Sequence, residues 1–315
     1  MNRLALVMLC IVAAGTGSLT GSTRAQVPLD LEEKIKAIGR VADPRATAAL
    51  YAPLSAPQSY LGVRVSRDLR YGSSDKQQLD LFEPEAMGAS PRPVLIFVHG
   101  GGFVAGDKHP PDSPFYDNVM LWAVNQGMIG VNVNYRLAPQ NPWPSGAEDL
   151  GIAVRWVQEN IASHGGDPRR VFLLGHSAGA AHVASYVAQS RVSGPAGVGL
   201  AGAILLSGNI FDPGTADVSP SLKAYYGEDV ALYGARSSLP GLLQSTLPLM
   251  VTSAEFDPVP FERQALQLQA ALCQKNRCPT FVRFAGHNHF SEVYSINSAD
   301  DAVGASLLAF IRATP

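Results

Sequence analysis

The chain has 315 residues, 46% of them apolar, and a formal net charge of −2. This length and apolar content allow one large globular domain, or two modest ones, with a buried core. Near-neutral charge without a clustered run of lysine or arginine argues against nucleic acid as the main partner.

The N-terminal segment has the layout of a secretory signal peptide. A basic residue precedes an apolar run at residues 4–14, which is shorter than the roughly 20 residues that span a bilayer. Thr23 and Ala25 are the small residues before a cleavage site near Gln26. We therefore expect residues 1–25 to be a signal peptide and the mature protein, without a membrane span, to be secreted or periplasmic. A membrane anchor or a buried helix is the alternative.

Residues 26–65 contain several prolines and predict a helix followed by a loop. A regular pattern begins after them, in which six short runs rich in Val, Ile and Leu alternate with helical periodicity. These runs predict strands at residues 93–98, 128–133, 170–174, 200–206, 247–252 and 280–284. Because the runs are apolar on both faces and bounded by glycine or proline, they are typical of central strands in a parallel sheet.

Apolar residues spaced three and four apart predict helices at 147–161 and 261–272, and we expect a last helix at 302–311. Strands that alternate with amphipathic helices predict an α/β fold with a mostly parallel, doubly wound sheet over residues 66–315. Residues 208–246 break this rhythm with glycines, prolines and the tyrosines 225, 226 and 233. We expect this stretch to be a small cap insertion, with residues 26–65 packed beside it.

The stretch "VFLLGHSAGAAH" fits the pattern Gly-x-Ser-x-Gly through Gly175, Ser177 and Gly179. It lies directly after a predicted strand and before a predicted helix. A sharp strand-to-helix turn there would project the serine hydroxyl, and the two glycines would allow the strand and helix to approach closely. The pattern indicates that Ser177 is a catalytic nucleophile; a purely structural turn is the alternative.

A second glycine-rich stretch, "VHGGGF", follows the first predicted strand. The N–H groups of Gly101 and Gly102, together with the N–H of Ala178 after the nucleophile, can form an oxyanion hole. We expect Gly100 and His99 to support this loop rather than react. A flexible turn or a phosphate-binding loop is the alternative, but no nucleotide-type glycine pattern continues from here.

Several motifs together resemble the α/β-hydrolase esterases, which include the hormone-sensitive-lipase-like carboxylesterases. They are "HGGGF", "NYRLAPQNPWPSGAEDL", "NIASHGGDPRRVFLLGHSAGA" and "SAEFDPVP". The stretch "YGSSDKQQLDLFEP" is similar to the branch of feruloyl esterases and kynurenine formamidases. The resemblance covers about residues 66–312 and implies an α/β-hydrolase fold, a Ser-Asp-His triad and no metal or organic cofactor. Asn134, where many relatives have aspartate, and Ala180, in place of a common third glycine, depart from the family pattern without removing a reacting group.

The triad order of this family places the acid and then the base after the nucleophile. Asp257 stands at the family's acid position, and Glu255 is the alternative. The loop "FAGHNHFS" offers His287 and His289 as bases. The resemblance favours His289, because relatives place a phenylalanine directly after the catalytic histidine. His287 is then a polar loop residue at the pocket entrance or, failing that, the alternative base.

Cys273 and Cys278 would be the two cysteines of the mature protein. In an oxidising compartment they predict a disulfide that closes a short loop, and two free thiols are the alternative. A zinc site is not indicated, since two sulfurs without a second ligand pair complete no tetrahedral shell.

The resemblance implies a serine carboxylesterase that acts on small-molecule esters with a small to medium acyl group. An arylformamidase would use the same triad and is the first alternative. The second is a binding protein without activity, although such relatives generally lose a triad residue or the oxyanion glycines. The sequence indicates no oligomeric state.

Overall fold

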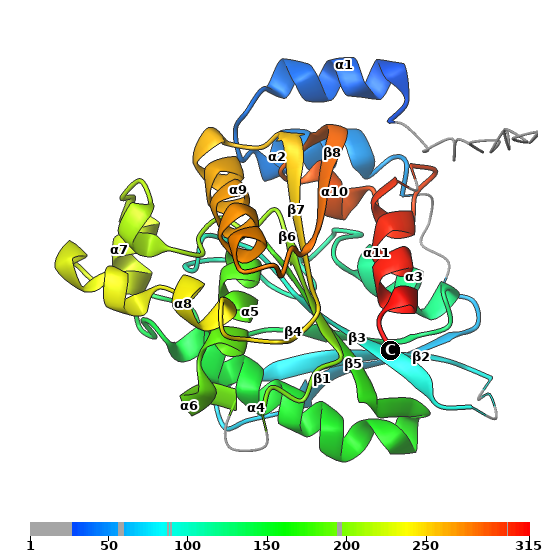
Figure 1. Cartoon of the computed structure of the whole chain (residues 1–315). Helices are drawn as coiled ribbons and strands as arrows, with labels where there is room; N and C mark the ends of the chain where they lie inside the picture. The colour runs from blue at the N-terminus through cyan, green and yellow to red at the C-terminus, as the bar shows by residue number, and fades with distance from the viewer. Residues whose placement is uncertain (1–26, 56–59, 87, 89, 194–196, 301) are drawn as a thin grey trace, which may run out of the picture.

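The computed structural model describes residues 27–55, 60–86, 88, 90–193, 197–300 and 302–315 (Figure 1). The predicted signal peptide, residues 1–25, lies outside the described residues. No helix in the described ranges is long and apolar enough to cross a membrane.

Eight strands form one sheet in the order β1-β2-β4-β3-β5-β6-β7-β8. The strands are β1 (Val63–Arg70), β2 (Gln78–Pro84), β3 (Arg92–Val98), β4 (Ile129–Val133), β5 (Gly166–His176), β6 (Gly202–Leu206), β7 (Leu249–Phe256) and β8 (Thr280–Asn288). β2 pairs antiparallel with both β1 and β4. The pairings from β4 through β8 are parallel. The six predicted strands are β3 to β8, and the prediction of a mostly parallel sheet is confirmed.

Helices connect and cover these strands. They are α1 (Leu29–Ile38), α2 (Pro44–Tyr51), α3 (Asp117–Asn125), α4 (Ser145–Asn160), α5 (Ala178–Ala188), α6 (Ser190–Ser193), α7 (Pro220–Tyr226), α8 (Leu239–Leu242), α9 (Val259–Gln274), α10 (Ser291–Tyr294) and α11 (Ala302–Ala313). Short 3₁₀ turns are η1 (Ile161–His164), η2 (Pro213–Thr215), η3 (Val230–Leu232) and η4 (Gly234–Arg236). The helices predicted at 147–161, 261–272 and 302–311 correspond to α4, α9 and α11.

The sheet is covered on both faces, because successive side chains of its strands point in opposite directions. In β3, Val94, Ile96 and Val98 join one apolar core with residues of α4, α5 and α9. Leu95 and Phe97 join the other core with residues of α3 and α11. Two buried faces explain why the central strands read as unbroken apolar runs.

The pair β1 and β2 gave no strand signal in the sequence, and β1 begins before the expected boundary at residue 66. Charged residues interrupt both strands. Asp80 of β2 is fully buried, and its carboxylate forms ion pairs with Arg67 and Lys108. A strand whose charges are neutralised by partners distant in sequence has no recognisable apolar pattern.

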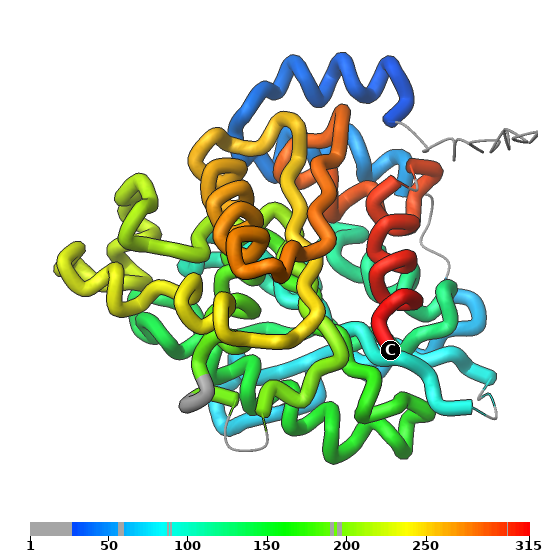
Figure 2. The backbone as a smooth tube through the Cα atoms, in the orientation of Figure 1, coloured from blue at the N-terminus to red at the C-terminus, as the bar shows by residue number. Residues whose placement is uncertain are grey.

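The stretch predicted as a cap, residues 208–246, consists of η2, α7, η3, η4 and α8 between β6 and β7. Figure 2 shows it as the yellow-green segment at the side of the molecule, next to α9. Its three tyrosines, Tyr225, Tyr226 and Tyr233, are buried. The Tyr225 ring stacks on Phe103, with ring centroids 4.5 Å apart. This packing fixes the insertion against the loop that carries the three glycines.

The N-terminal segment, blue at the top of Figure 1, packs where α1 contacts β8 and α2 contacts α10. Asp43 caps α2 by accepting a hydrogen bond from the Ala46 N–H at 2.9 Å. Arg40 Nε donates to the backbone oxygen of Asp257 at 2.7 Å. This segment therefore holds the loop that follows β7.

A disulfide joins Cys273, near the end of α9, to Cys278, just before β8. Closing so short a loop removes chain entropy worth about 2 kcal/mol from the unfolded state. We expect the double variant C273S/C278S to lose about 2 kcal/mol in free energy of unfolding, measured with denaturant, while kcat is unchanged. The wild-type protein in reducing buffer is the matched control. A lower kcat in the folded double variant would show instead that this loop supports the active site.

Candidate active site

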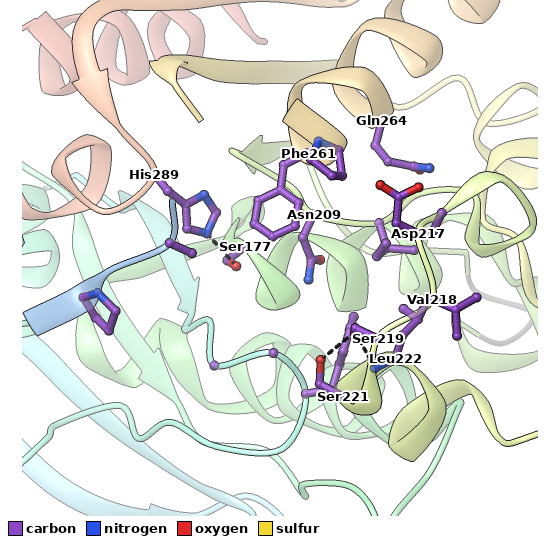
Figure 3. Close-up of a pocket in the computed structure, with 18 of the residues that line it drawn as sticks. Ser177, Asn209, Asp217, Val218, Ser219, Ser221, Leu222, Phe261, Gln264 and His289 are labelled. Atoms are coloured by element: carbon purple, nitrogen blue, oxygen red, sulfur yellow. Dashed lines mark hydrogen bonds between the residues drawn. The ribbon is translucent and has the colours of Figure 1, made fainter. Parts of the chain in front are cut away.

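The residues predicted for catalysis meet where the parallel strands end (Figure 3). Ser177 follows β5, Asp257 follows β7 and His289 follows β8. The Ser177 hydroxyl lies 2.8 Å from His289 Nε2, and His289 Nδ1 lies 2.9 Å from Asp257 Oδ1. All three side chains are buried. The carboxyl ends of neighbouring parallel strands share one edge of a sheet, and this brings together three residues that are far apart in the chain.

The backbone around Ser177 forms a sharp turn between β5 and α5. Ser177 has φ 57° and ψ −123°, a conformation that residues other than glycine rarely adopt. A Cβ on Gly179 would lie 2.2 Å from the backbone oxygen of Val98, and one on Gly175 would lie 2.5 Å from the backbone of Gly179. Glycine is therefore required at both positions for α5 to pack against β5 and the end of β3.

The carboxylate of Asp257 is surrounded by hydrogen-bond donors. Its Oδ1 faces the Nδ1 of His289. Its Oδ2 accepts from the backbone N–H of Ala254 and from the Ser207 hydroxyl, each at 2.7 Å. Glu255, the alternative acid, instead accepts from the Gly286 N–H at 2.9 Å. Asp257, and not Glu255, is hydrogen-bonded to the histidine.

The two histidines of the β8 loop have different surroundings. The His287 side chain is buried and does not line the pocket, so its predicted place at the entrance is wrong. Its Nδ1 lies 3.1 Å from the Ser291 hydroxyl, and its Nε2 lies 3.5 Å from Asp300 Oδ2. Burial lowers the pKa of His287 to about 4, so its ring is neutral near neutral pH. His287 is thus paired with Ser291 at the start of α10, whereas Ser177 is hydrogen-bonded to His289.

The glycine loop after β3 lies directly against Ser177. A Cβ on Gly100 would lie 2.9 Å from the Ser177 Cβ, and Gly101 and Gly102 have φ values of 128° and 59°. Within the described part of the chain, no acceptor takes a hydrogen bond from the N–H groups of Gly101, Gly102 or Ala178. Gly101 and Gly102 line the same pocket as Ser177. These N–H groups are thus available to a substrate oxygen.

The side chain of His99 supports the glycine loop through a hydrogen bond to its backbone. Its Nδ1 lies 2.6 Å from the oxygen of Gly100, and its ring stacks on Tyr135. Tyr135 donates a hydrogen bond to the backbone oxygen of His99. Burial lowers the pKa of His99 to about 4, so the neutral ring donates one hydrogen bond and holds the loop.

Two residues near the triad carried no assigned role in the sequence. The Nε2 of His176, within the Gly-x-Ser-x-Gly pattern, lies 2.8 Å from the backbone oxygen of His289. Burial, and then the charge of His289, lowers the pKa of His176 well below its usual value. The neutral His176 ring therefore donates to this oxygen and fixes the histidine backbone. Ser207, directly after β6, is the other residue that the sequence did not indicate. Its position at the end of a predicted strand was the one available signal.

A cavity of about 510 Å³ opens above the triad. Its lining comes from the N-terminal segment, the glycine loop, the cap, α9 and the β8 loop, and includes Ala42, Pro44, Phe103, Asn209, Ile210, Val218, Ser221, Leu222, Phe261, Gln264 and Phe290. Figure 3 shows Asn209 and Phe261 beside Ser177 and His289. Gln264 receives hydrogen bonds from the N–H groups of Phe211 and Asp212, which joins the cap to α9.

In the part of the chain that the structure describes, no cluster of three or more His, Cys, Asp or Glu side chains could hold a metal ion.

Comparison with known proteins gives the family. Residues 47–226, more than half of the chain, match the family model described as the carboxylesterase family. The chain belongs to the carboxylesterase family.

Curated relatives of this carboxylesterase-family chain align with its central part. Carboxylesterase NlhH from Mycobacterium tuberculosis is 42% identical over 107 residues, which are 33% of this chain and 31% of that protein. Esterase B1 from Culex pipiens is 37% identical over 118 residues, 36% of this chain and 22% of that protein. The alignments thus span less than a third of the length of either relative.

Solved structures resemble nearly the whole chain. Esterase B from Lactobacillus rhamnosis (HN001) has a TM-score of 0.71 at 19% identity, with 90% of this chain and 95% of that chain covered. A bacterial heroin esterase has a TM-score of 0.69 at 23% identity, with 93% and 100% covered. These likenesses confirm the predicted α/β-hydrolase fold.

The two histidines can be separated by substitution. We expect H289A to lower kcat by at least about 10³-fold, because Ser177 loses its proton acceptor. H287A should leave kcat within a few-fold of wild type but lower the free energy of unfolding by about 1–3 kcal/mol, since it opens a buried cavity and removes a hydrogen bond. Steady-state kinetics and denaturant unfolding on both variants make the comparison. The opposite pattern would exchange the roles of the two residues.

Proposed function

We propose that the chain is a serine hydrolase of carboxylic esters. The hydrogen-bonded series Ser177, His289 and Asp257 at the base of an apolar cavity carries this proposal. Membership of the carboxylesterase family supports it. The reaction uses these side chains, backbone N–H groups and water.

In the first half of the reaction, His289 Nε2 takes the proton of Ser177 as the serine oxygen attacks the ester carbonyl. Asp257 Oδ1, which accepts the Nδ1 proton of His289, fixes the ring tautomer and stabilises the imidazolium. His289 then gives its proton to the leaving alcohol, and an acyl-serine remains. Water, deprotonated by His289, attacks the acyl-serine and releases the acid, and Ser177 regains its proton.

The negative oxygen of each tetrahedral intermediate would lie at the glycine loop. The N–H groups of Gly101, Gly102 and Ala178 are the proposed donors, and each such donor lowers a barrier of this kind by about 3 kcal/mol. Ala178 is also the first residue of α5, so the helix dipole adds positive potential at this point. Ser177 and the loop glycines line one cavity, as such stabilisation requires.

The cavity supports substrates of modest size. About 510 Å³ is within the range of pockets that hold small molecules. Three aromatic rings, those of Phe103, Phe261 and Phe290, contribute to its lining and favour apolar groups. Asn209 contributes a buried side-chain amide to the lining, and its Oδ1, which has no hydrogen-bond partner among the described residues, can accept a hydrogen bond from the substrate. We propose esters with a small to medium acyl group.

We also propose that the mature protein is exported. The N-terminal pattern of residues 1–25 supports this, and so does the disulfide between Cys273 and Cys278, because disulfides persist mainly in oxidising compartments. Mass determination of the protein from the extracellular and periplasmic fractions would test it. A cytoplasmic chain that retains its first residues would contradict it.

The proposed reaction predicts a specific acyl-length profile. We expect p-nitrophenyl esters with two to six acyl carbons to be turned over, with kcat/KM falling at least about 10-fold for long acyl chains that the cavity cannot enclose. S177A, which is the matched control, should lack this activity and should not react with a fluorophosphonate probe.

The same assay tests the two rival functions. A higher kcat/KM for N-formylkynurenine than for aryl acetates would identify an arylformamidase instead of an esterase. Absence of both turnover and probe labelling in the folded wild-type protein would favour a binding protein.

A further inference from the structure

Glu292 is a carboxylic acid with no exposed surface, located on α10 just after the base His289. Its Oε2 lies 3.2 Å from the Thr252 hydroxyl, and its Oε1 has no hydrogen-bond partner. No lysine, arginine or histidine in the described ranges forms an ion pair with it. A charged carboxylate in such a place would be strongly unfavourable.

The Ser207 hydroxyl lies between Glu292 and the acid of the triad. It donates to Asp257 Oδ2 at 2.7 Å, and its interaction with the Glu292 carboxyl lowers the pKa of that acid, against the larger effect of burial. The backbone N–H of Ser207 donates to Thr252 Oγ1 at 3.1 Å, which fixes the serine between the two acids. One hydroxyl proton cannot satisfy two carboxylates, so one of the two acids must bring a proton of its own.

The surroundings decide which acid carries that proton. Asp257 faces three donors, namely the Ala254 N–H, the Ser207 hydroxyl and His289 Nδ1. Glu292 has the Thr252 hydroxyl and an unsatisfied oxygen. Burial, followed by the negative charge of Asp257, raises the pKa of Glu292 well above its usual value. The carboxylate of Asp257 supplies this negative charge, whereas Thr252 of β7 and Ser207 after β6 are uncharged.

We propose that Glu292 is a positioning residue that stays a neutral carboxylic acid and donates its hydrogen bond to Ser207. Ser207 must then direct its own proton to Asp257. The hydrogen bonds run in one direction, from Glu292 to Ser207 to Asp257, and meet the bond from His289 at the same carboxylate. Ionised Glu292 would accept the hydrogen bond of the Ser207 hydroxyl in place of Asp257, and it would put a second negative charge beside Asp257. This inference rests on the proposed ester hydrolysis.

The direct test is difference infrared spectroscopy of the wild-type protein and E292Q at neutral pH. We expect the carbonyl stretch of a protonated carboxylic acid in the wild-type protein and its absence from E292Q. A wild-type spectrum without this band would overturn the inference. This readout requires no activity.

The kinetic test compares E292Q with E292M on p-nitrophenyl acetate. The amide of E292Q is neutral and can still donate to Ser207, so kcat should stay within about 3-fold of wild type. E292M removes a neutral hydrogen bond that orients the Ser207 hydroxyl and should lower kcat by about 5-fold, with KM unchanged because Glu292 does not line the cavity. A residue that supported only the fold would give no such difference in kcat between folded variants.

S207A gives a second route if E292M does not fold. It removes the donor to Asp257 and should also lower kcat by about 10-fold, and E292Q should add no further loss in the S207A background. Wild-type kcat in E292M or S207A would overturn the inference, as would E292Q that is as impaired as E292M. Inactive wild-type protein would overturn the proposed function instead, and S177A supplies the blank rate.

Discussion

The close contact between α5 and the end of β3 is the constraint on which the site depends. Gly179 has no room for a side chain, because a Cβ there would meet the backbone oxygen of Val98. That contact fixes where α5 begins, and the helix start forces Ser177 into a strained conformation in which its hydroxyl faces His289. It also places the glycine loop after β3 beside the serine. The nucleophile and its proposed oxyanion donors are therefore positioned by one packing contact.

The remaining walls come from segments that are far apart in sequence but packed around the same strand ends. Gln264 on α9 holds the cap, and Arg40 of the N-terminal segment holds the Asp257 loop. The cap in turn rests on Phe103 of the glycine loop through Tyr225. Because these contacts link the cavity walls to the loops that carry the triad, the size of the cavity and the alignment of the triad are not independent properties.

Part of this site could be predicted from the sequence, because its turns need glycine at fixed positions. Gly-x-Ser-x-Gly and the three glycines need no distant partner to be recognised, and the apolar central strands follow from burial on both faces. β2 was not recognised, since Asp80 is neutralised by partners elsewhere in the chain. His287 was misplaced for the same reason: nothing in "FAGHNHFS" reveals that its ring is enclosed near Asp300. Ser207 and Glu292 are ordinary polar residues until the fold brings them to Asp257.

Burial around the triad has a common electrostatic effect. It lowers the pKa of both His176 and His287, and it raises the pKa of Glu292, so all three groups are neutral near neutral pH. Each of them still has a hydrogen-bond partner close to the triad. Asp257 is then the charged group that faces His289 when the ring receives the serine proton. A site built in this way stabilises the imidazolium with one negative charge, and the neutral acids and bases nearby hold the geometry without competing for the proton.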